Sequence, residues 1–275
     1  MPAVLDQSVV SEPDVARYRV DGCVVLRGVF SADEVDTVRS GIERNLAEPG
    51  PLFAVASSDT DPGRFVEDFC NWQRIEEYRE VAEHSRAADI AGALMGSTTV
   101  RLFHDHLLVK EPGTQQVTPW HQDQPYYNVD GAQNCSMWMP VDPVAAESTL
   151  EFLAGSHLGG WRLPRTFLTE QARWFPEGTL EELPDIESRR DEFDIRAWAL
   201  EPGDAVFFHM LTAHHAYGVP GSSRRRVFSL RFLGDDATHA PRPWRTSPQF
   251  DGLEDELPAG APMDHPIFPV LRVSP

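Results

Sequence analysis

The chain has 275 residues, of which 41% are hydrophobic and 24% charged, and its 24 Lys and Arg against 43 Asp and Glu give a formal net charge of −19. This is the composition of a globular protein, and it excludes a disordered, collagen-like or coiled-coil chain. The negative charge repels phosphate backbones and anionic lipid headgroups, which argues against a nucleic-acid or membrane partner.

The first residues and the cysteines indicate a compartment. The N-terminus lacks the basic and apolar segments of a secretory signal, and no apolar run approaches the length of a membrane helix, so we expect a cytoplasmic protein. The three cysteines, Cys23, Cys70 and Cys135, are widely spaced. This spacing argues against a disulfide framework or a thiolate zinc site and favours reduced, mostly buried thiols.

Two helices are predicted in the first third of the chain, after a short apolar strand at residues 22–26. Ser31 and Glu34 have the spacing of a capping box, and Glu48-Pro49-Gly50 ends the helix that follows. Its apolar residues recur at helical spacing and predict one buried stripe: Val35, Val38, Ile42 and Leu46. A second helix is expected over residues 75–94, with Tyr78, Val81, Ala82 and Ile90 as its buried face.

From Thr98 onward, short apolar or alternating segments separated by Pro, Gly and Asn or Asp predict an all-β sandwich or barrel. The expected strands are 100–110, 118–123, 135–141, 150–153, 197–200, 205–209 and 227–233. Residues 158–194 form a polar insertion, which we interpret as a lid or substrate loop, or else as a solvated acidic segment, with a possible helix at 169–174. The apolar residues 266–271 should pack back on the body, so residues 1–275 are expected to form a single domain.

The most informative residues are His121 and Asp123. On a strand, residues two apart project from the same face, so this imidazole and this carboxylate would lie together while Gln122 points away. A third ligand should come from a histidine on another strand, and residues 203–215 supply candidates. Two histidines and one carboxylate leave open coordination positions, the arrangement that non-haem Fe(II) oxygenases use. An isolated His-x-Asp pattern is weak evidence by itself.

Several ordered motifs between residues 20 and 235 make the signal specific. They are DGCVVLRGVF at 21–30, KEPG at 110–113, WHQD at 120–123, LEFLAGSH at 150–157, the Gly203-Asp204 to His214 segment, and RRVFSLRF at 225–232. Together they resemble the phytanoyl-CoA dioxygenase-like family of Fe(II)/2-oxoglutarate oxygenases. The resemblance implies a mainly β fold, a double-stranded β-helix (jelly roll, cupin-like) with flanking N-terminal helices.

The resemblance also implies a metal site. It places the iron ligands at His121, Asp123 and His214, with the adjacent His215 as the alternative to His214, and makes His209 a strand-end residue. An alanine or glycine in place of Asp123, as in halogenating relatives, is absent here, so chlorination is disfavoured.

In this family an arginine lies eleven residues after the distal histidine and binds the far carboxylate of 2-oxoglutarate. Counting from His214 gives Arg225, and counting from His215 gives Arg226. Arg225 is preferred, because Ser229 would share its strand face, and the planar guanidinium matches a carboxylate. Ser229 and Lys110, the sole lysine, are further candidates for the co-substrate site, although Lys110 is equally compatible with the surface.

Candidate substrate-binding residues lie near these motifs. They are His104, His106, Gln122, Tyr127 and Trp138. His104 and His106 share a strand face, so they could line the pocket, serve as structural histidines or form a separate metal site.

The implied activity is that of an Fe(II)- and 2-oxoglutarate-dependent dioxygenase that hydroxylates a C–H bond of a small molecule and releases succinate and CO2, with dioxygen as oxidant. Nothing in the sequence recruits coenzyme A, so phytanoyl-CoA is not expected as the substrate. Two alternatives remain open. One is a jelly-roll metal enzyme that does not use 2-oxoglutarate, and the other is a non-catalytic small-molecule-binding protein. The sequence does not specify an oligomeric state.

Overall fold

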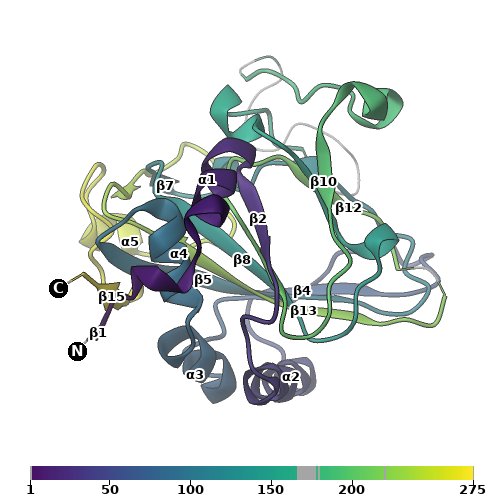
Figure 1. Ribbon diagram of the computed structural model, residues 1–275, viewed down its shortest axis with the longest axis horizontal. Helices are drawn as coiled ribbons and strands as arrows, with labels where there is room; N and C mark the ends of the chain where they lie inside the picture. The colour runs from purple at the N-terminus through teal and green to yellow at the C-terminus, as the bar shows by residue number, and fades with distance from the viewer. Residues whose placement is uncertain (1, 166–177, 179, 220, 275) are drawn as a thin grey trace.

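The computed structural model describes residues 2–165, 178, 180–219 and 221–274, and two facing β-sheets dominate it (Figure 1). The larger sheet has nine strands. Seven of them follow the order β1 (Ala3–Val4), β15 (Val270–Val273), β5 (Thr99–Lys110), β13 (Arg225–Leu233), β8 (Asn134–Pro140), β11 (Ala205–Phe208) and β2 (Cys23–Leu26). The other two are β4 (Phe65–Phe69), which also pairs with β5, and β3 (Ala54–Val55), which pairs with β4. The smaller sheet has the order β10 (Ile195–Ala197), β9 (Leu150–Leu153), β12 (His214–Ala216) and β6 (Thr118–His121). A separate two-stranded sheet joins β14 (Thr238–His239) to β7 (Val129–Asp130).

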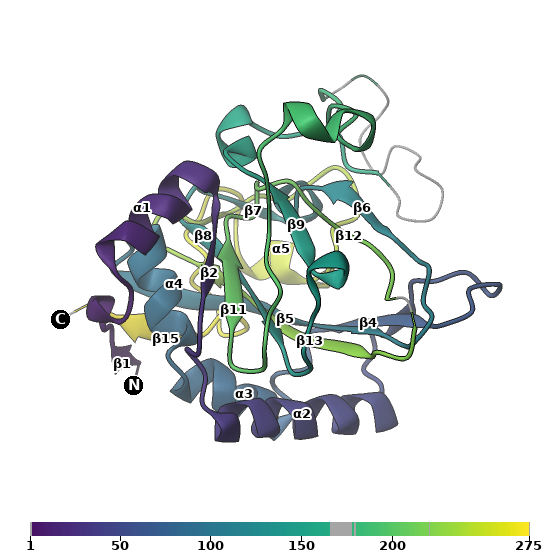
Figure 2. The same ribbon diagram turned by 45° about the vertical axis from the view of Figure 1, so that its right-hand side comes forward.

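The helices of the first third cover the outer face of the larger sheet. They are α1 (Glu12–Asp21), α2 (Ala32–Ala47), α3 (Glu76–His84) and α4 (Ala87–Met95). In Figure 2, α2 and α3 lie below β5 and β13. Their apolar faces join the outward side chains of the sheet in the main core, where Tyr78 stacks on Phe228 at 4.3 Å between ring centroids. The remaining helical turns are short: α5 (Leu253–Glu256), η1 (Gln7–Val9), η2 (Gln124–Tyr126), η3 (Ala146–Ser148), η4 (Ser156–Gly159) and η5 (Glu187–Glu192).

A second apolar cluster lies between the two sheets. Trp138, Val206 and Val227 of the larger sheet pack there against Leu150 and Phe152 of the smaller one. Because strand residues alternate between faces, β8, β11 and β13 supply side chains to both this cluster and the helix-covered core. The expected mainly β jelly roll with N-terminal helices is confirmed. None of the helices among the described residues has the length and apolar character needed to cross a membrane.

The predicted helix with the capping box is confirmed as α2, where the Ser31 side chain accepts from the Glu34 amide and the Glu34 carboxylate accepts from the Ser31 amide. The single helix expected over 75–94 is wrong. Ser85 divides it into α3 and α4, because its extended backbone interrupts the helix while its hydroxyl donates to the Val81 carbonyl and accepts from the Ala87 amide. The helix α1, capped by Ser11, was not predicted.

Most predicted strands are confirmed within two residues at either end. The strand expected at 197–200 is wrong. The strand β10 ends at Ala197, and Leu200 forms an isolated bridge with Val144. The short strands β4 and β12 were not predicted. The C-terminal residues pack back as expected, with Phe268 buried and β15 paired to β5. The cysteines are free, and the helix predicted at 169–174 lies outside the described residues.

Candidate active site

Three potential metal ligands meet where β6 ends and β12 begins. His121 ends β6 and pairs across the antiparallel ladder with His214, the first residue of β12. Asp123 follows β6, and its side-chain Oδ1 lies 3.6 Å from Nε2 of each imidazole. All three residues are buried, and their ligand atoms lie within 4.8 Å of one another. The structure therefore brings together the three residues that the sequence motifs singled out.

Asp123 reaches this position by a turn and not by strand alternation. The strand predicted for 118–123 ends at His121, and the Asp123 backbone is in the right-handed helical region (φ −74, ψ −45) at the start of η2. The Asp123 amide donates to the Met210 carbonyl at 2.8 Å, which ties this turn to the segment that precedes β12.

The hydrogen bonds of the two imidazoles suit metal binding. His121 Nδ1 lies 2.8 Å from the Pro119 carbonyl, and His214 Nδ1 lies 2.9 Å from the Thr212 carbonyl. A ring nitrogen that faces a carbonyl donates to it, so Nδ1 carries a proton in each ring and Nε2 is the atom that can bind a metal. Burial lowers the pKa of His214 to about 3, helped by the neighbouring His121 and opposed by Asp123, and this keeps the imidazole neutral. Two imidazoles and one carboxylate are a donor set that fits Fe(II).

Arg231 holds the free oxygen of the Asp123 carboxylate. Its Nη2 lies 3.1 Å from Asp123 Oδ2, and it also donates to the Tyr127 hydroxyl at 3.2 Å and to Ser229. Burial alone would raise the pKa of Asp123, but Arg231 and the two imidazoles outweigh burial and hold this pKa well below its usual range. Arg231 was not predicted as a site residue. The alternation from Arg225 through Ser229 along one face of β13 was the signal that could have found it.

Replacing Arg231 with leucine is expected to destabilise the metal-free protein by about 3–5 kcal/mol, because the Asp123 carboxylate would remain buried without a counter-charge. A divalent cation would supply that charge. The rise in melting temperature on adding Mn(II) should therefore be larger in the Arg231→Leu variant than in the wild type. Thermal unfolding with and without Mn(II) measures both effects, and equal melting temperatures of the two metal-free proteins would contradict the expectation.

Arg225 provides a second, separate positive charge. It begins β13, is buried, donates to the Ser148 carbonyl, and its guanidinium carbon lies 5.7 Å from the centre of the Trp138 ring. Among the described residues no carboxylate pairs with it, and burial lowers its pKa to about 10. A buried guanidinium without a counter-ion is a site for an anionic ligand.

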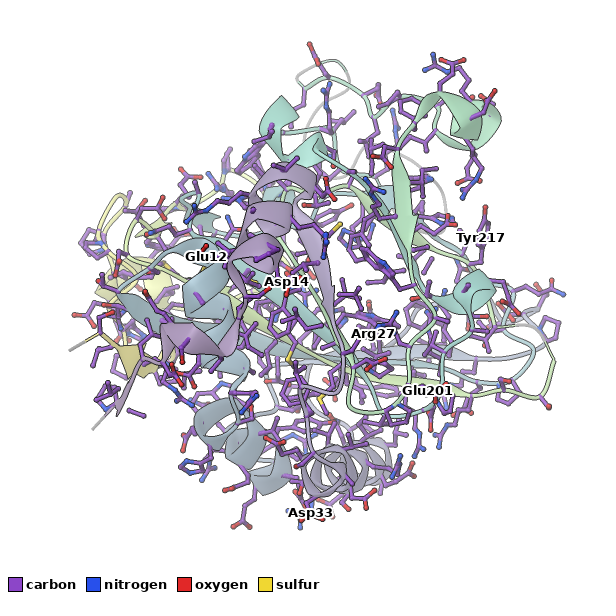
Figure 3. The ribbon with its side chains drawn as sticks, in the orientation of Figure 1. Glu12, Asp14, Arg27, Asp33, Glu201 and Tyr217 are labelled. Atoms are coloured by element: carbon purple, nitrogen blue, oxygen red, sulfur yellow. The ribbon has the colours of Figure 1, made fainter. Side chains whose placement is uncertain are left out.

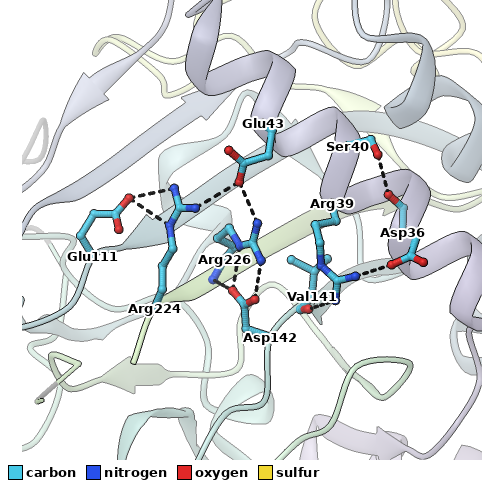
Figure 4. Close-up of polar contacts among 9 residues, drawn as sticks. All are labelled: Asp36, Arg39, Ser40, Glu43, Glu111, Val141, Asp142, Arg224 and Arg226. Atoms are coloured by element: carbon cyan, nitrogen blue, oxygen red, sulfur yellow. Dashed lines mark hydrogen bonds and ion pairs between the residues drawn. The ribbon is translucent and has the colours of Figure 1, made fainter. Parts of the chain in front are cut away.

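The adjacent arginines face the opposite side of the sheet. Arg226 donates to both oxygens of Asp142 and to Glu43 of α2, and Arg224 pairs with Glu43 and Glu111 (Figure 4). The alternation expected from the sequence thus separates Arg225 from its neighbours, and Arg224 is part of an ion-pair network on α2.

One cavity of about 640 Å³ connects these groups. Its lining residues are Val55, Ala56, Phe65, Glu67, Phe69, His106, Leu108, Thr118, His121, Asp123, Tyr126, Tyr127, Trp138, Leu150, Phe208, His214, Ala216, Arg225, Arg231 and Ser247. The predicted substrate residues His106, Tyr127 and Trp138 are among them. A large concave site with few convergent polar groups is the usual form of a small-molecule site.

The structure does not bring Lys110 or Ser229 to this cavity. The Lys110 ammonium is fully buried and donates to the carbonyls of Gln116 at 2.7 Å and Tyr217 at 3.0 Å, so the surface alternative is wrong. Burial lowers the pKa of Lys110 well below its usual range. Ser229 donates to the Met137 carbonyl and accepts from Arg231, so it orients that arginine.

Gln122 and His104 also lie outside the cavity lining. Gln122 points away from the metal ligands, as predicted, and its side chain donates to the carbonyls of Gly160 and Leu211 and accepts from the Arg162 amide. It therefore anchors the start of the insertion. The His104 ring is fully buried, with Nδ1 3.1 Å from the Asp105 carbonyl. Among the described residues, His104 and His106 belong to no group of three potential metal ligands.

His215 points to the other side of the small sheet. Its Nδ1 lies 3.4 Å from Glu151 Oε2, and its ring stacks on Trp120 at 5.2 Å. Glu151, Glu187 and His215 form a second group of potential ligands, but Arg190 of η5 donates to both carboxylates. Tyr217, labelled in Figure 3, donates to Glu187 at 2.9 Å. This network joins η5 of the insertion to β9 and β12.

The similarity of this chain to known proteins supports this description of the site. Residues 18–227 match the model of the phytanoyl-CoA dioxygenase family. The chain is 27% identical over 256 residues to ectoine dioxygenase of Stutzerimonas stutzeri (strain A1501), which covers 86% of this chain and 82% of that protein. It is 23% identical over 253 residues to a probable phytanoyl-CoA dioxygenase of Caenorhabditis elegans, with coverage of 83% and 77%.

Solved structures show the same relationship. The epimerase SnoN, in complex with Fe3+, alpha ketoglutarate and nogalamycin RO, has a TM-score of 0.76 and 25% identity, with 95% of this chain and 98% of that chain covered. The alpha ketoglutarate dependent carbocyclase SnoK from nogalamycin biosynthesis has a TM-score of 0.74 and 25% identity, with coverage of 98% and 99%. With its His-Asp-His trio in place, the chain therefore belongs to the phytanoyl-CoA dioxygenase family and is a non-haem iron dioxygenase that uses 2-oxoglutarate.

Proposed function

We propose that this protein hydroxylates a C–H bond of a small molecule, that His121, Asp123 and His214 hold the Fe(II), and that Arg225 binds the distal carboxylate of 2-oxoglutarate. One observation carries the proposal. The same cavity is lined by the buried His-Asp-His trio and by a buried arginine that has no carboxylate partner among the described residues. A metal and a dicarboxylate co-substrate are the two ligands that these groups suit.

The residues of the chain have distinct roles in this reaction. When bound, Fe(II) and 2-oxoglutarate supply dioxygen activation, with decarboxylation to succinate providing two electrons. Backbone carbonyls hold the His121 and His214 rings at Nδ1, which leaves each Nε2 for the metal. Arg231 fixes the orientation of the Asp123 carboxylate, so that one oxygen is left for the metal. Leu150 and Phe208 line the cavity and exclude water from it.

The relatives guide the choice of test compounds. Ectoine is the first substrate to test, because a relative named ectoine dioxygenase matches most of the chain. The structural neighbours are named epimerase and carbocyclase, so the product has to be identified as well as the co-substrate consumed.

To test this proposal, the Fe(II)-loaded protein is incubated with 2-oxoglutarate, dioxygen and a panel of small molecules. The amount of succinate and the mass of each product are then measured. We expect substrate-dependent succinate formation and a product that has gained one oxygen atom. A product of unchanged mass would indicate epimerisation, and a product that has lost two hydrogen atoms would indicate desaturation or ring closure. Either result would contradict the hydroxylation proposal.

A further inference from the structure

The strand β4 brings a carboxylate into the cavity from the same sheet that carries Arg225 and Arg231. Residues Phe65, Glu67 and Phe69 alternate along β4 and all line the cavity. The intervening Val66 joins the helix-covered core, and Asp68 accepts from the Asn45 amide on that side. The pairing of β4 with β5 places Phe69 opposite His106, which also lines the cavity. The direction of Glu67 is therefore set by the sheet and is not that of a loose surface residue.

The charges that line the cavity leave Glu67 without a positive partner. The lining includes four charged residues: Glu67, Asp123, Arg225 and Arg231. Asp123 pairs with Arg231, and the charge of Arg225 is available to the distal carboxylate of the co-substrate. In the part of the chain that the structure describes, no lysine or arginine pairs with Glu67.

Among the described residues, the basic side chain in contact with Glu67 is that of His106, whose Nε2 lies 3.4 Å from Glu67 Oε2. The His106 ring stacks on Phe69 at 3.9 Å between ring centroids and is buried. Burial lowers the pKa of His106, although Glu67 opposes this, so the imidazole is mainly neutral at pH 7. A neutral imidazole at this distance does not cancel the charge of the carboxylate.

The surroundings of Glu67 strengthen its attraction for a cation. Its side chain is 21% exposed, and Phe65 and Phe69 stand on either side of it along the strand. Charge pairs are stronger where apolar walls exclude water, and an unpaired carboxylate in such a place favours a ligand of opposite charge.

We propose that the substrate is an organic cation, and that its positively charged nitrogen binds Glu67 in the part of the cavity formed by β4 and His106. This inference rests on the proposed function, since it names the substrate class of the same site. Glu67 would be a specificity-determining residue that holds the cationic end of the substrate while another part of it lies at the metal.

The test uses three probes of similar size and different charge: benzylamine, benzyl alcohol and benzoate. Binding to the protein loaded with Fe(II) and saturated with 2-oxoglutarate is measured by calorimetry without oxygen, so that Arg225 is already occupied. We expect benzylamine to bind at least about tenfold more tightly than benzyl alcohol, and benzoate to bind more weakly than either. Equal affinity for the amine and the alcohol, or no binding of the amine, would overturn the proposal, and neither result depends on a variant.

The variant Glu67→Gln keeps the shape of the side chain and removes its charge. It should lose the tenfold preference for benzylamine and keep the affinity for benzyl alcohol. The matched control is Glu80→Gln, which removes the same charge from the exposed outer side of α3, and it should bind benzylamine like the wild type. Retained amine preference in a folded Glu67→Gln protein would contradict the assignment to Glu67.

Two further measurements distinguish a failure of the proposed function from a failure of the cation site. The same titrations are repeated on the metal-free protein without 2-oxoglutarate, and succinate formation is measured independently. Amine selection through Glu67 without succinate would mean that the oxygenase reaction fails while the cation site stands. Succinate formation without amine selection would mean the reverse.

Discussion

Replacing His214 with alanine is expected to abolish Fe(II) binding and to reduce 2-oxoglutarate turnover at least about 1,000-fold. The imidazole of His214 lies 3.6 Å from Asp123 and presents Nε2 to the centre of the trio, so the variant lacks one of three ligands. Loss of a partner that only supports a ligand already costs about 10–100-fold, and loss of a ligand costs more. Anaerobic titration with Fe(II) and then 2-oxoglutarate, followed by visible absorption, measures the site directly.

The adjacent His215 provides the control. Its imidazole lies against Glu151 and Trp120 on the other side of the strand, so His215→Ala should retain Fe(II) binding. We expect this variant to weaken the attachment of η5, which raises the rate of proteolysis in the insertion. If His215→Ala lost the metal while His214→Ala kept it, the placement of the site would be wrong.

Replacing Arg225 with leucine is expected to raise the KM for 2-oxoglutarate at least about 100-fold, because a buried charge pair with the distal carboxylate would be lost. The wild type should discriminate strongly between 2-oxoglutarate and 2-oxopentanoate, which lacks that carboxylate. Arg225→Leu should lose this discrimination. Rates of CO2 release from the two oxo acids, measured over a range of concentrations, give the result.

Arg226→Leu is the matched control for this experiment. Arg226 pairs with Asp142 and Glu43 on the helix-covered face, so its loss should lower the melting temperature and leave the KM for 2-oxoglutarate unchanged (Figure 4). A raised KM in Arg226→Leu with a normal KM in Arg225→Leu would reverse the assignment of the two arginines.

Local features of this protein were predictable from the sequence alone. The capping box at Ser31 and Glu34 and the apolar stripe of α2 depend on neighbouring residues, and both are confirmed. The long strand β5 and most of the sheet were visible as alternating segments. The linear motifs around His121 and His214 also indicated the family and the class of cofactor, because residue type and spacing determine which metal and which chemistry are possible.

Other features depend on which distant segments meet. Alternation shows that Arg225 and Arg226 face opposite sides of the sheet, but the packing of α2 decides which side is covered by helices and which side faces the cavity. Arg231 meets Asp123, and Glu67 enters the cavity, only because of the register of β13 and β4 in the folded sheet. The position of Lys110 was not predictable for the same reason, because its buried ammonium donates to the carbonyls of Gln116 and Tyr217, which come from two segments far apart in the sequence. Sequence patterns determine the face and the chemistry of a residue, whereas tertiary pairing determines its partner, because sheet register joins residues that no local interaction connects.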